Sequence, residues 1–144
     1  DYADAASGRT KELTAKIKVA ESRMAEIAVL KTHIINYAKT RDIYTAYRKA
    51  GYSKKYYDAH ESDIIIHKAA KKAFDELALK KLPTVKSLQA EYSDLLVQKK
   101  LDYAARAKAR EEARQLQIYK ANAEMLLRTD ADEQRQTREH QQEK

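Results

Sequence analysis

The chain contains no cysteine and no tryptophan, and only two glycines and one proline occur among its 144 residues. Without cysteine, it can form neither a disulfide framework nor a thiolate metal site. Glycine and proline supply much of the turn chemistry that a strand-rich fold needs, so this chain has few places at which it can reverse direction. These absences favour a protein built from a few long helices.

Long apolar runs are also missing, because no stretch approaches the roughly 20 residues that a membrane-spanning helix requires. The opening residues, DYAD, do not resemble a signal peptide. We therefore expect a soluble, cytoplasmic protein without membrane insertion. The sequence does not begin with methionine, and we expect it to be a piece of a longer polypeptide.

Charge is plentiful: 35% of the residues are Asp, Glu, Lys or Arg, and the net charge is +7. A basic balance favours contact with nucleic acid, an acidic partner or a membrane surface, although lysines also simply keep long helices in solution. The distribution is uneven. Residues 37–58 carry six cations against two acids, whereas residues 129–144 carry five acids against three cations. Any anion-binding surface is therefore expected in the middle of the chain.

Apolar residues recur every three or four positions in two long segments, a spacing typical of amphipathic helices with a coiled-coil seam. The first predicted helix covers about residues 10–38, and the second, which starts after Pro83, covers about 84–128. Each has a narrow apolar stripe that needs a long partner. Their seams contain Leu13, Ile17, Ala20, Met24, Ile27 and Ile34 in the first helix, and Val85, Leu88, Tyr92, Leu95 and Leu96 in the second.

Three shorter helices are predicted between these two, at about residues 40–50, 53–60 and 62–81. The last of them has a broad apolar face, which suits a helix wedged against both long ones. The predicted fold is therefore all-α, an elongated, coiled-coil-like antiparallel pair of long helices with the short helices forming a cap at one end. We expect a disordered lead at residues 1–9. Residues 129–144 have no apolar residue except Ala131, which predicts a frayed helix or a disordered tail.

The most unusual segment is YRKAGYSKKYY, residues 47–57, in which four tyrosines and four cations occur without an acid. Gly51 is suited to the left-handed conformation that follows a helix C-cap. In that ending, the side chains of Tyr47 and Tyr52 occupy the two positions that contact each other. The first half of the segment is thus predicted to be a helix terminus.

The second half reads as the start of a new helix. Ser53 is the expected N-cap, and Tyr52 and Tyr57 then occupy the positions of a hydrophobic staple. Lys54 and Lys55 do not fit this explanation, because cations in a first helical turn oppose the helix dipole. A first turn flanked by lysines would suit a phosphate group.

We therefore predict a surface that contacts DNA phosphates without reading bases. Tyr56 is a candidate for base stacking, although tyrosines at helical spacing more often bury their rings at the rim of a thin core. Lys68, Lys71 and Lys72 would extend the surface if they joined Lys54 and Lys55 in space. The predicted phosphate contacts are Arg48, Lys49, Lys54, Lys55, Lys68, Lys71 and Lys72.

No catalytic constellation is recognisable, and we expect no enzyme activity, metal or cofactor in this chain. The four histidines form no closely spaced ligand pair. His60 and His67, with Glu61 and Asp63 nearby, could in principle hold a metal, but ordinary polar roles are favoured. A tyrosine nucleophile would need a metal or a base to activate it, and the sequence supplies no such partner.

The amino-acid sequence of several segments resembles that of a known protein family. The run LKTHIINYAKTRDIYTAYRKAGYSKKYYDAHESDIIIHKAAKKAFDEL, followed by KLPTVKSLQAEY and YKANAEMLL, is similar to the C-terminal region of mobilisation relaxases from Gram-positive conjugative and integrative elements. The resemblance covers about residues 10–128. Relaxases nick DNA with a tyrosine in an N-terminal domain that also has a histidine-rich metal motif, and this chain has neither motif.

The resemblance implies a non-catalytic helical module of a DNA-processing enzyme that takes part in type IV secretion. Its expected partners are DNA and the relaxosome or coupling protein. The rival hypothesis is a coiled-coil module for protein interaction or self-association, including a homodimer through the long helices. In that case, exposed seam positions such as Leu30, Ile35 and Leu101 would contact another chain.

Overall fold

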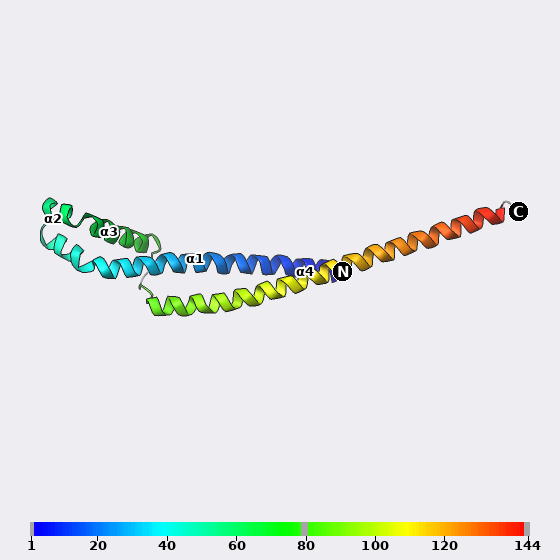
Figure 1. Cartoon of the computed structure of the whole chain (residues 1–144), viewed down its shortest axis with the longest axis horizontal. Coiled ribbons are helices and arrows are strands. Elements are labelled where there is room, and N and C mark those ends of the chain that lie inside the picture. Colours follow the sequence, from blue (N-terminus) through cyan, green and yellow to red (C-terminus); the bar gives the residue numbers. More distant parts are fainter. Residues whose placement is uncertain (1, 79–80, 143–144) are drawn as a thin grey trace. The chain divides into compact units, whose positions relative to one another are not determined.

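The structure, a computed structural model, describes residues 2–78 and 81–142. Within these residues it contains four helices and no strand (Figure 1): α1 (Tyr2–Lys49), α2 (Lys54–Ala59), α3 (Glu61–Glu76) and α4 (Val85–Gln142). The predicted all-α fold with two long helices is confirmed. None of the helices in the described part of the chain is long and apolar enough to cross a membrane.

The chain divides into two compact units, and both long helices contribute to each of them. Unit 1 combines residues 1–17 with residues 100–144, and unit 2 comprises residues 18–99. Unit 2 therefore contains the greater part of α1, all of α2 and α3, and the first turns of α4.

The core of unit 2 is a cluster to which three helices contribute. Ile27 and Leu30 come from α1, Ala70 and Phe74 from α3, and Leu88 from α4, and all five are buried. Burial of each large apolar side chain contributes about 1.5–3 kcal/mol. Helix α3 is thus packed against both α1 and α4, as the broad apolar face of the third predicted short helix indicated.

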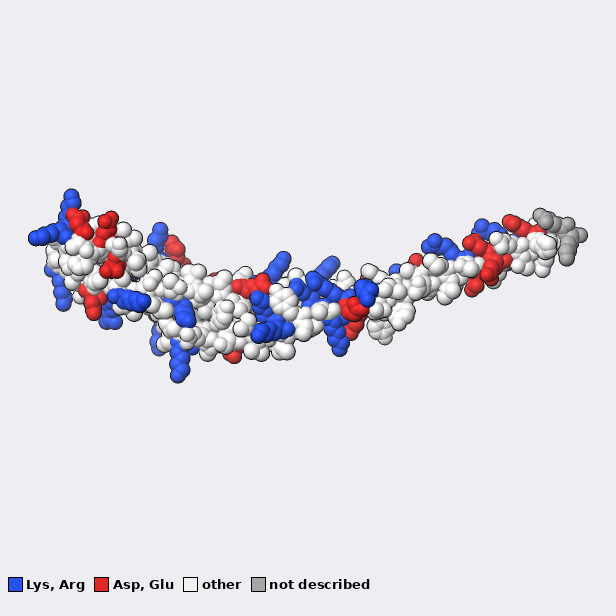
Figure 2. Space-filling model, viewed as in Figure 1, with Lys and Arg blue, Asp and Glu red and all other residues white. Residues whose placement is uncertain are grey.

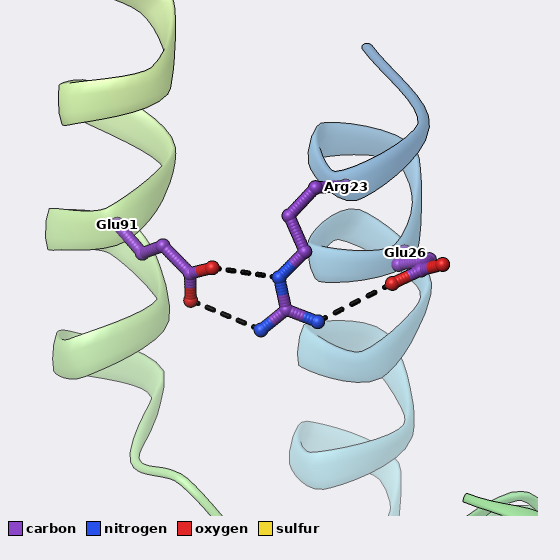
Figure 3. A network of polar contacts seen from close by, with 3 residues as sticks. All are labelled: Arg23, Glu26 and Glu91. Carbon is purple, nitrogen blue, oxygen red and sulfur yellow. Dashed lines mark hydrogen bonds and ion pairs between the residues drawn. The ribbon is translucent and has the colours of Figure 1, made fainter. Parts of the chain in front are cut away.

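Ion pairs define the direction of α4 relative to α1 in unit 2. Arg23 donates hydrogen bonds to both carboxylate oxygens of Glu91, at 2.6 and 3.0 Å, and contacts Glu26 at 3.3 Å (Figure 3). Lys99 pairs with Glu21 at 3.4 Å. Because a later residue of α4 meets an earlier residue of α1, the two helices run antiparallel.

Unit 1 has the same antiparallel order but a thinner contact. Ala6, Ile17 and Ala109 are buried there, and two of these three side chains are the small methyl group of alanine, which allows the helix backbones to approach closely. Polar contacts between α1 and α4 in this unit include Lys16 to Asp102 at 3.6 Å, Arg106 to Thr14 at 3.3 Å, and Arg9 to Glu112 at 3.9 Å.

The N-terminal boundaries of the predicted helices are wrong in two places. α1 begins at Tyr2, so the expected disordered lead is helical over residues 2–9, because Ala6 is buried and its carbonyl accepts a hydrogen bond from Thr10. The expected break between residues 38 and 40 is also absent. Thr40 is helical and buried against His67 of α3, and α1 continues through this position to Lys49.

The C-terminal boundaries differ as well. α3 ends at Glu76 instead of residue 81, because Ala78 adopts a left-handed φ of 49°, and residues 79 and 80 of the prediction lie outside the described part. Thr84 caps α4 by accepting a hydrogen bond from the Ser87 amide at 3.0 Å, which agrees with the predicted start. α4 then continues past residue 128 to Gln142, so the tail is an exposed helix there.

Candidate nucleic-acid interface

The corner between α1 and α2 has the predicted helix ending. The Gly51 amide donates to the Arg48 carbonyl at 3.1 Å, and the Tyr52 amide donates to the Tyr47 carbonyl at 3.0 Å, the two bonds that define a Schellman motif. Gly51 has a left-handed φ of 66°. The rings of Tyr47 and Tyr52 are 5.3 Å apart and nearly perpendicular. These residues therefore have structural roles.

The start of α2 also matches its prediction in part. The hydroxyl of Ser53 accepts a hydrogen bond from the Tyr56 amide at 3.4 Å, which confirms the N-cap. The rings of Tyr52 and Tyr57 both pack on Tyr47, so Tyr47 lies at the centre of the corner. The sequence did not predict that Tyr52 also has a left-handed φ, 60°. For a residue with a side chain this conformation costs about 1–2 kcal/mol.

Tyr56, the candidate for base stacking, is used by the fold. Its ring is half-buried and stacks on His60 at 4.2 Å, and its hydroxyl donates to the Ile43 carbonyl at 3.1 Å. Tyr47 lies parallel to the same ring at 6.1 Å. These contacts hold α2 against α1, and they count against a role in stacking a nucleobase, because a base would have to displace them.

The buried His67 of α3 contacts three residues of α1. The His67 ring is stacked between Tyr37, at 4.6 Å, and Tyr44, at 4.4 Å. Its Nδ1 lies 2.9 Å from the hydroxyl of Thr40. Because that hydroxyl donates to Asn36, it accepts from Nδ1–H of the neutral ring. Burial, with the nearby charge of Lys71, lowers the pKa of His67.

The seven cations predicted to contact phosphate all lie in unit 2 and are exposed. Arg48 and Lys49 end α1, Lys54 and Lys55 begin α2, and the other three lie on α3. The ammonium of Lys68 lies 6.0 Å from the centroid of the Tyr47 ring, so this α3 lysine reaches the corner. Among the salt bridges of the described residues, none involves these seven side chains.

The lysines of α3 share one side of that helix. At 100° per residue, Lys68, Lys71 and Lys72 fall within about 100° of one another. Glu61 and Asp75 occupy the same side, and Figure 2 shows red acidic atoms among the blue basic ones near α2 and α3. Residues 48–76 carry seven cations and five acids, a net charge of +2. The surface is therefore moderately basic, and its field is short-ranged at physiological salt.

The histidines that could have held a metal have other contacts. His60 Nδ1 lies 3.1 Å from the Tyr56 carbonyl, and His67 is enclosed by tyrosines. In residues 2–78 and 81–142, no group of three or more His, Cys, Asp or Glu side chains is placed to hold a metal ion. The contacts of His60 and His67 are those of ordinary polar residues that hold helices together.

The positions named for the rival hypothesis are not equivalent in the structure. Leu30 is buried in the core of unit 2, so its prediction as an exposed contact was wrong. Ile35 is half-buried, whereas Leu101 is largely exposed. Tyr119, Leu126 and Leu127 of α4 are also largely exposed. The sequence places Tyr119 and Leu127 on a weaker continuation of the second helix's apolar face, but sequence reasoning did not name these two residues or Leu126 as contacts for another chain.

No protein-family model matches the chain, and no curated protein or solved structure shows significant similarity to it.

Proposed function

We propose that this chain is a non-catalytic C-terminal helical module of a conjugative DNA relaxase that acts in the cytoplasm. It would support mobilisation of a plasmid or transposon by accessory, sequence-independent contact with DNA, by docking to the relaxosome or coupling protein, or by both. The resemblance over residues 10–128 supports the family. The observation that carries the DNA contact is the group of seven exposed cations around the α1–α2–α3 corner, none of which has a salt bridge within the described chain.

Lys54 and Lys55 are the strongest members of this group. Local hydrogen bonds and ring contacts account for the other residues of the corner, Tyr47, Gly51, Tyr52 and Ser53. The two lysines, in contrast, lie in the first turn of α2, where the helix dipole disfavours positive charge. Their side chains are therefore not accounted for by helix stability. Binding a phosphate would supply the missing counter-charge, and a flexible lysine provides it without base specificity.

The test is a titration of fluorescent duplex and single-stranded DNA with the 144-residue protein at several salt concentrations. We expect binding at low salt, with the logarithm of the affinity falling linearly with the logarithm of the salt concentration. Affinity should be similar for unrelated sequences of equal length. A protein that fails to bind DNA at about 20 mM salt would rule out the DNA contact.

A second candidate function is a coiled-coil module for protein interaction or self-association, without a nucleic-acid role. The observation that favours it is the exposure of Tyr119, Leu126 and Leu127 on one face of α4. Large apolar side chains gathered on a surface commonly mark an interaction site. Light scattering over a concentration series separates self-association from a site for a different protein.

A further inference from the structure

The outer part of α4 has no partner helix within the described chain. α1 starts at Tyr2, which lies beside Glu112 and Leu116 of α4, and every residue from 117 to 142 is exposed. Tyr119, Leu126 and Leu127 are each 67–70% exposed. Most helical stability in proteins comes from packing of an apolar face, and residues 117–142 have no such packing within the described chain.

Five apolar residues on one side of the outer part of α4 form a stripe, and all of them except the half-buried Leu116 are exposed. Ile118 and Met125 are also exposed, but they lie on the opposite side of the helix. Leu116, Tyr119, Ala123 and Leu126 follow the three-four-three spacing of a coiled-coil seam, and Leu127 widens it. At 100° per residue, the five side chains fall within about 100° of the helix circumference. We call these five residues the outer stripe. It continues, at seven-residue intervals, the line of Asp102 and Ala109, which are buried in unit 1.

We propose that the outer stripe binds the outer stripe of a second copy of this chain, with the two α4 helices antiparallel and related by a twofold axis near residue 121. This inference rests on the second candidate function and names its partner. A twofold axis makes the interface self-complementary, since each copy offers the same surface to the other.

Side-chain size supports the antiparallel order. With the axis near residue 121, Leu116 of one copy faces Leu126 of the other, and Tyr119 faces Ala123. A large residue then meets a small one in both central layers, as dense packing requires. In a parallel pair in register, Tyr119 would face its own equivalent and Ala123 would face another Ala123. The layer with two tyrosines would then be overcrowded, and the neighbouring layer with two alanines would leave an empty space.

Charge supports the same order. Among residues 2–17 and 100–113 there are seven cations and five acids, a net charge of +2, whereas residues 129–142 carry two cations and four acids, a net charge of −2. An antiparallel pair centred near residue 121 brings residues 129–142 of one copy level with residues 113–100 of the other. Opposite net charges then meet, whereas a parallel pair would align like with like.

The start of α1 limits how far the two helices stay in contact. Because Tyr2 already lies beside Leu116, the second copy has to cross α4 at the outer stripe and then pass beside α1. The stripe spans 12 residues, or about 18 Å of helix. This contact is shorter than a standard interface of about 800 Å² per partner, so we expect a reversible dimer that forms at micromolar protein concentrations or above.

The first experiment is sedimentation equilibrium of the full 144-residue protein from about 1 to 500 µM, with two matched variants. Leu126 and Met125 are adjacent and equally exposed, at 67% and 66%, but Met125 lies outside the stripe. We expect Leu126→Lys to weaken dimerisation by more than about 100-fold, because it affects two symmetric contacts. Met125→Lys should change the dissociation constant of the dimer by less than about three-fold, because the Met125 side chain does not contact the second copy.

Three outcomes would overturn the proposal: a monomer at all concentrations, equal effects of the two variants, or a higher oligomer unaffected by Leu126→Lys. A monomer would leave the outer stripe to a different protein or to a segment of the natural polypeptide outside these 144 residues. Circular dichroism of both variants checks that the helices are retained. DNA titration of the same samples separates the two proposals, because a monomer that binds DNA overturns the dimer alone.

The second experiment determines direction. The chain has no cysteine, so Gln136→Cys accepts a single spin label on the exposed face of α4. In the antiparallel dimer the two labels are about 45 Å apart along the helix axis, from 15 residues on each side of the centre at 1.5 Å per residue. A parallel dimer would place them within about 20 Å of each other, and that result would overturn the antiparallel order.

Discussion

Arg23 of α1 binds the carboxylate of Glu91 of α4 through two hydrogen bonds, 2.6 Å from Nε and 3.0 Å from Nη2 (Figure 3). The two residues are 68 positions apart in the sequence, and their contact joins the two long helices in unit 2. The guanidinium lowers the pKa of Glu91 and is itself held more firmly protonated by that carboxylate. Both side chains remain about 40% exposed, so solvent screens much of the attraction.

We expect a coupling energy of about 0.5–1 kcal/mol from a double-mutant cycle with Arg23→Ala and Glu91→Ala. This is the upper part of the range for surface pairs, because the contact is bidentate. Chemical denaturation at low salt measures it. Arg23→Lys keeps the charge but loses the two-pronged geometry, so it should recover less than half of the coupling. A coupling of zero, or one unchanged in 1 M salt, would contradict this account.

His67 should make the stability of unit 2 depend on pH. Its pKa in the folded state lies below the ordinary value of 6.5, because burial disfavours the charged ring and Lys71 repels it. The unfolded chain therefore binds more protons than the folded one as the pH falls below 6.5. The contribution of His67 to the free energy of unfolding is therefore fully present above pH 6.5. It declines below pH 6.5, by at most about 1.4 kcal/mol per pH unit.

The measurement is urea denaturation of the protein and of His67→Gln between pH 5 and pH 8. His67→Gln lacks the titrating ring, so the difference between the two unfolding free energies should shrink as the pH falls. Subtracting the two curves removes the contributions of the other histidines, which are present in both proteins. A difference that is constant or grows towards pH 5 would show that His67 is not held neutral by the fold.

The two glycines should respond to alanine in opposite directions. At neither position does an added Cβ meet an atom within 4 Å, so the backbone decides the outcome. Gly8 lies inside α1, where alanine should stabilise by about 0.5–1 kcal/mol. Gly51 has a left-handed φ of 66°, where alanine should destabilise by about 1–2 kcal/mol. Thermal and urea denaturation test both, and equal signs for the two variants would refute the argument.

The two lysines at the start of α2 should be the most sensitive to charge reversal in DNA binding. We expect Lys54→Glu with Lys55→Glu to weaken binding at least ten-fold and to reduce the salt slope by about two. The matched control is Lys11→Glu with Lys18→Glu, which changes the net charge equally at exposed positions on α1. Equal losses in both double variants would mean that net charge, and not the corner, determines affinity.

Local chemistry made the corner at residues 47–57 predictable. Gly51 and Ser53 fix a helix end and a helix start by hydrogen bonds within a few residues, and the structure contains those bonds. Helix boundaries set by distant contacts were not predictable. Thr40 stays helical with its side chain buried against His67, and Ala6 is buried in unit 1, so neither the expected break nor the expected disordered lead occurs.

The candidate site was predictable only as a set of charges. The sequence identified the seven cations, but it did not show that acids such as Glu61 and Asp75 share a helix side with the α3 lysines. It named Tyr56 as a candidate for base stacking, whereas the ring and hydroxyl of Tyr56 hold α2 on α1. It also named Leu30 as an exposed contact and gave no weight to Leu126. Exposure depends on which helix covers which turn, and that information is not local.

The sequence by itself determined that this protein is helical, because its apolar residues recur every three or four positions and its turn residues are nearly confined to Gly51 and Pro83. It also determined how α1 ends and how α2 and α4 begin, since caps are made by neighbours in the chain. The tertiary structure alone decided which side chains the helices bury. It enclosed His67 between Tyr37 and Tyr44, joined Arg23 to Glu91, and left Leu126 exposed, because each of these depends on residues that meet only after the chain has folded.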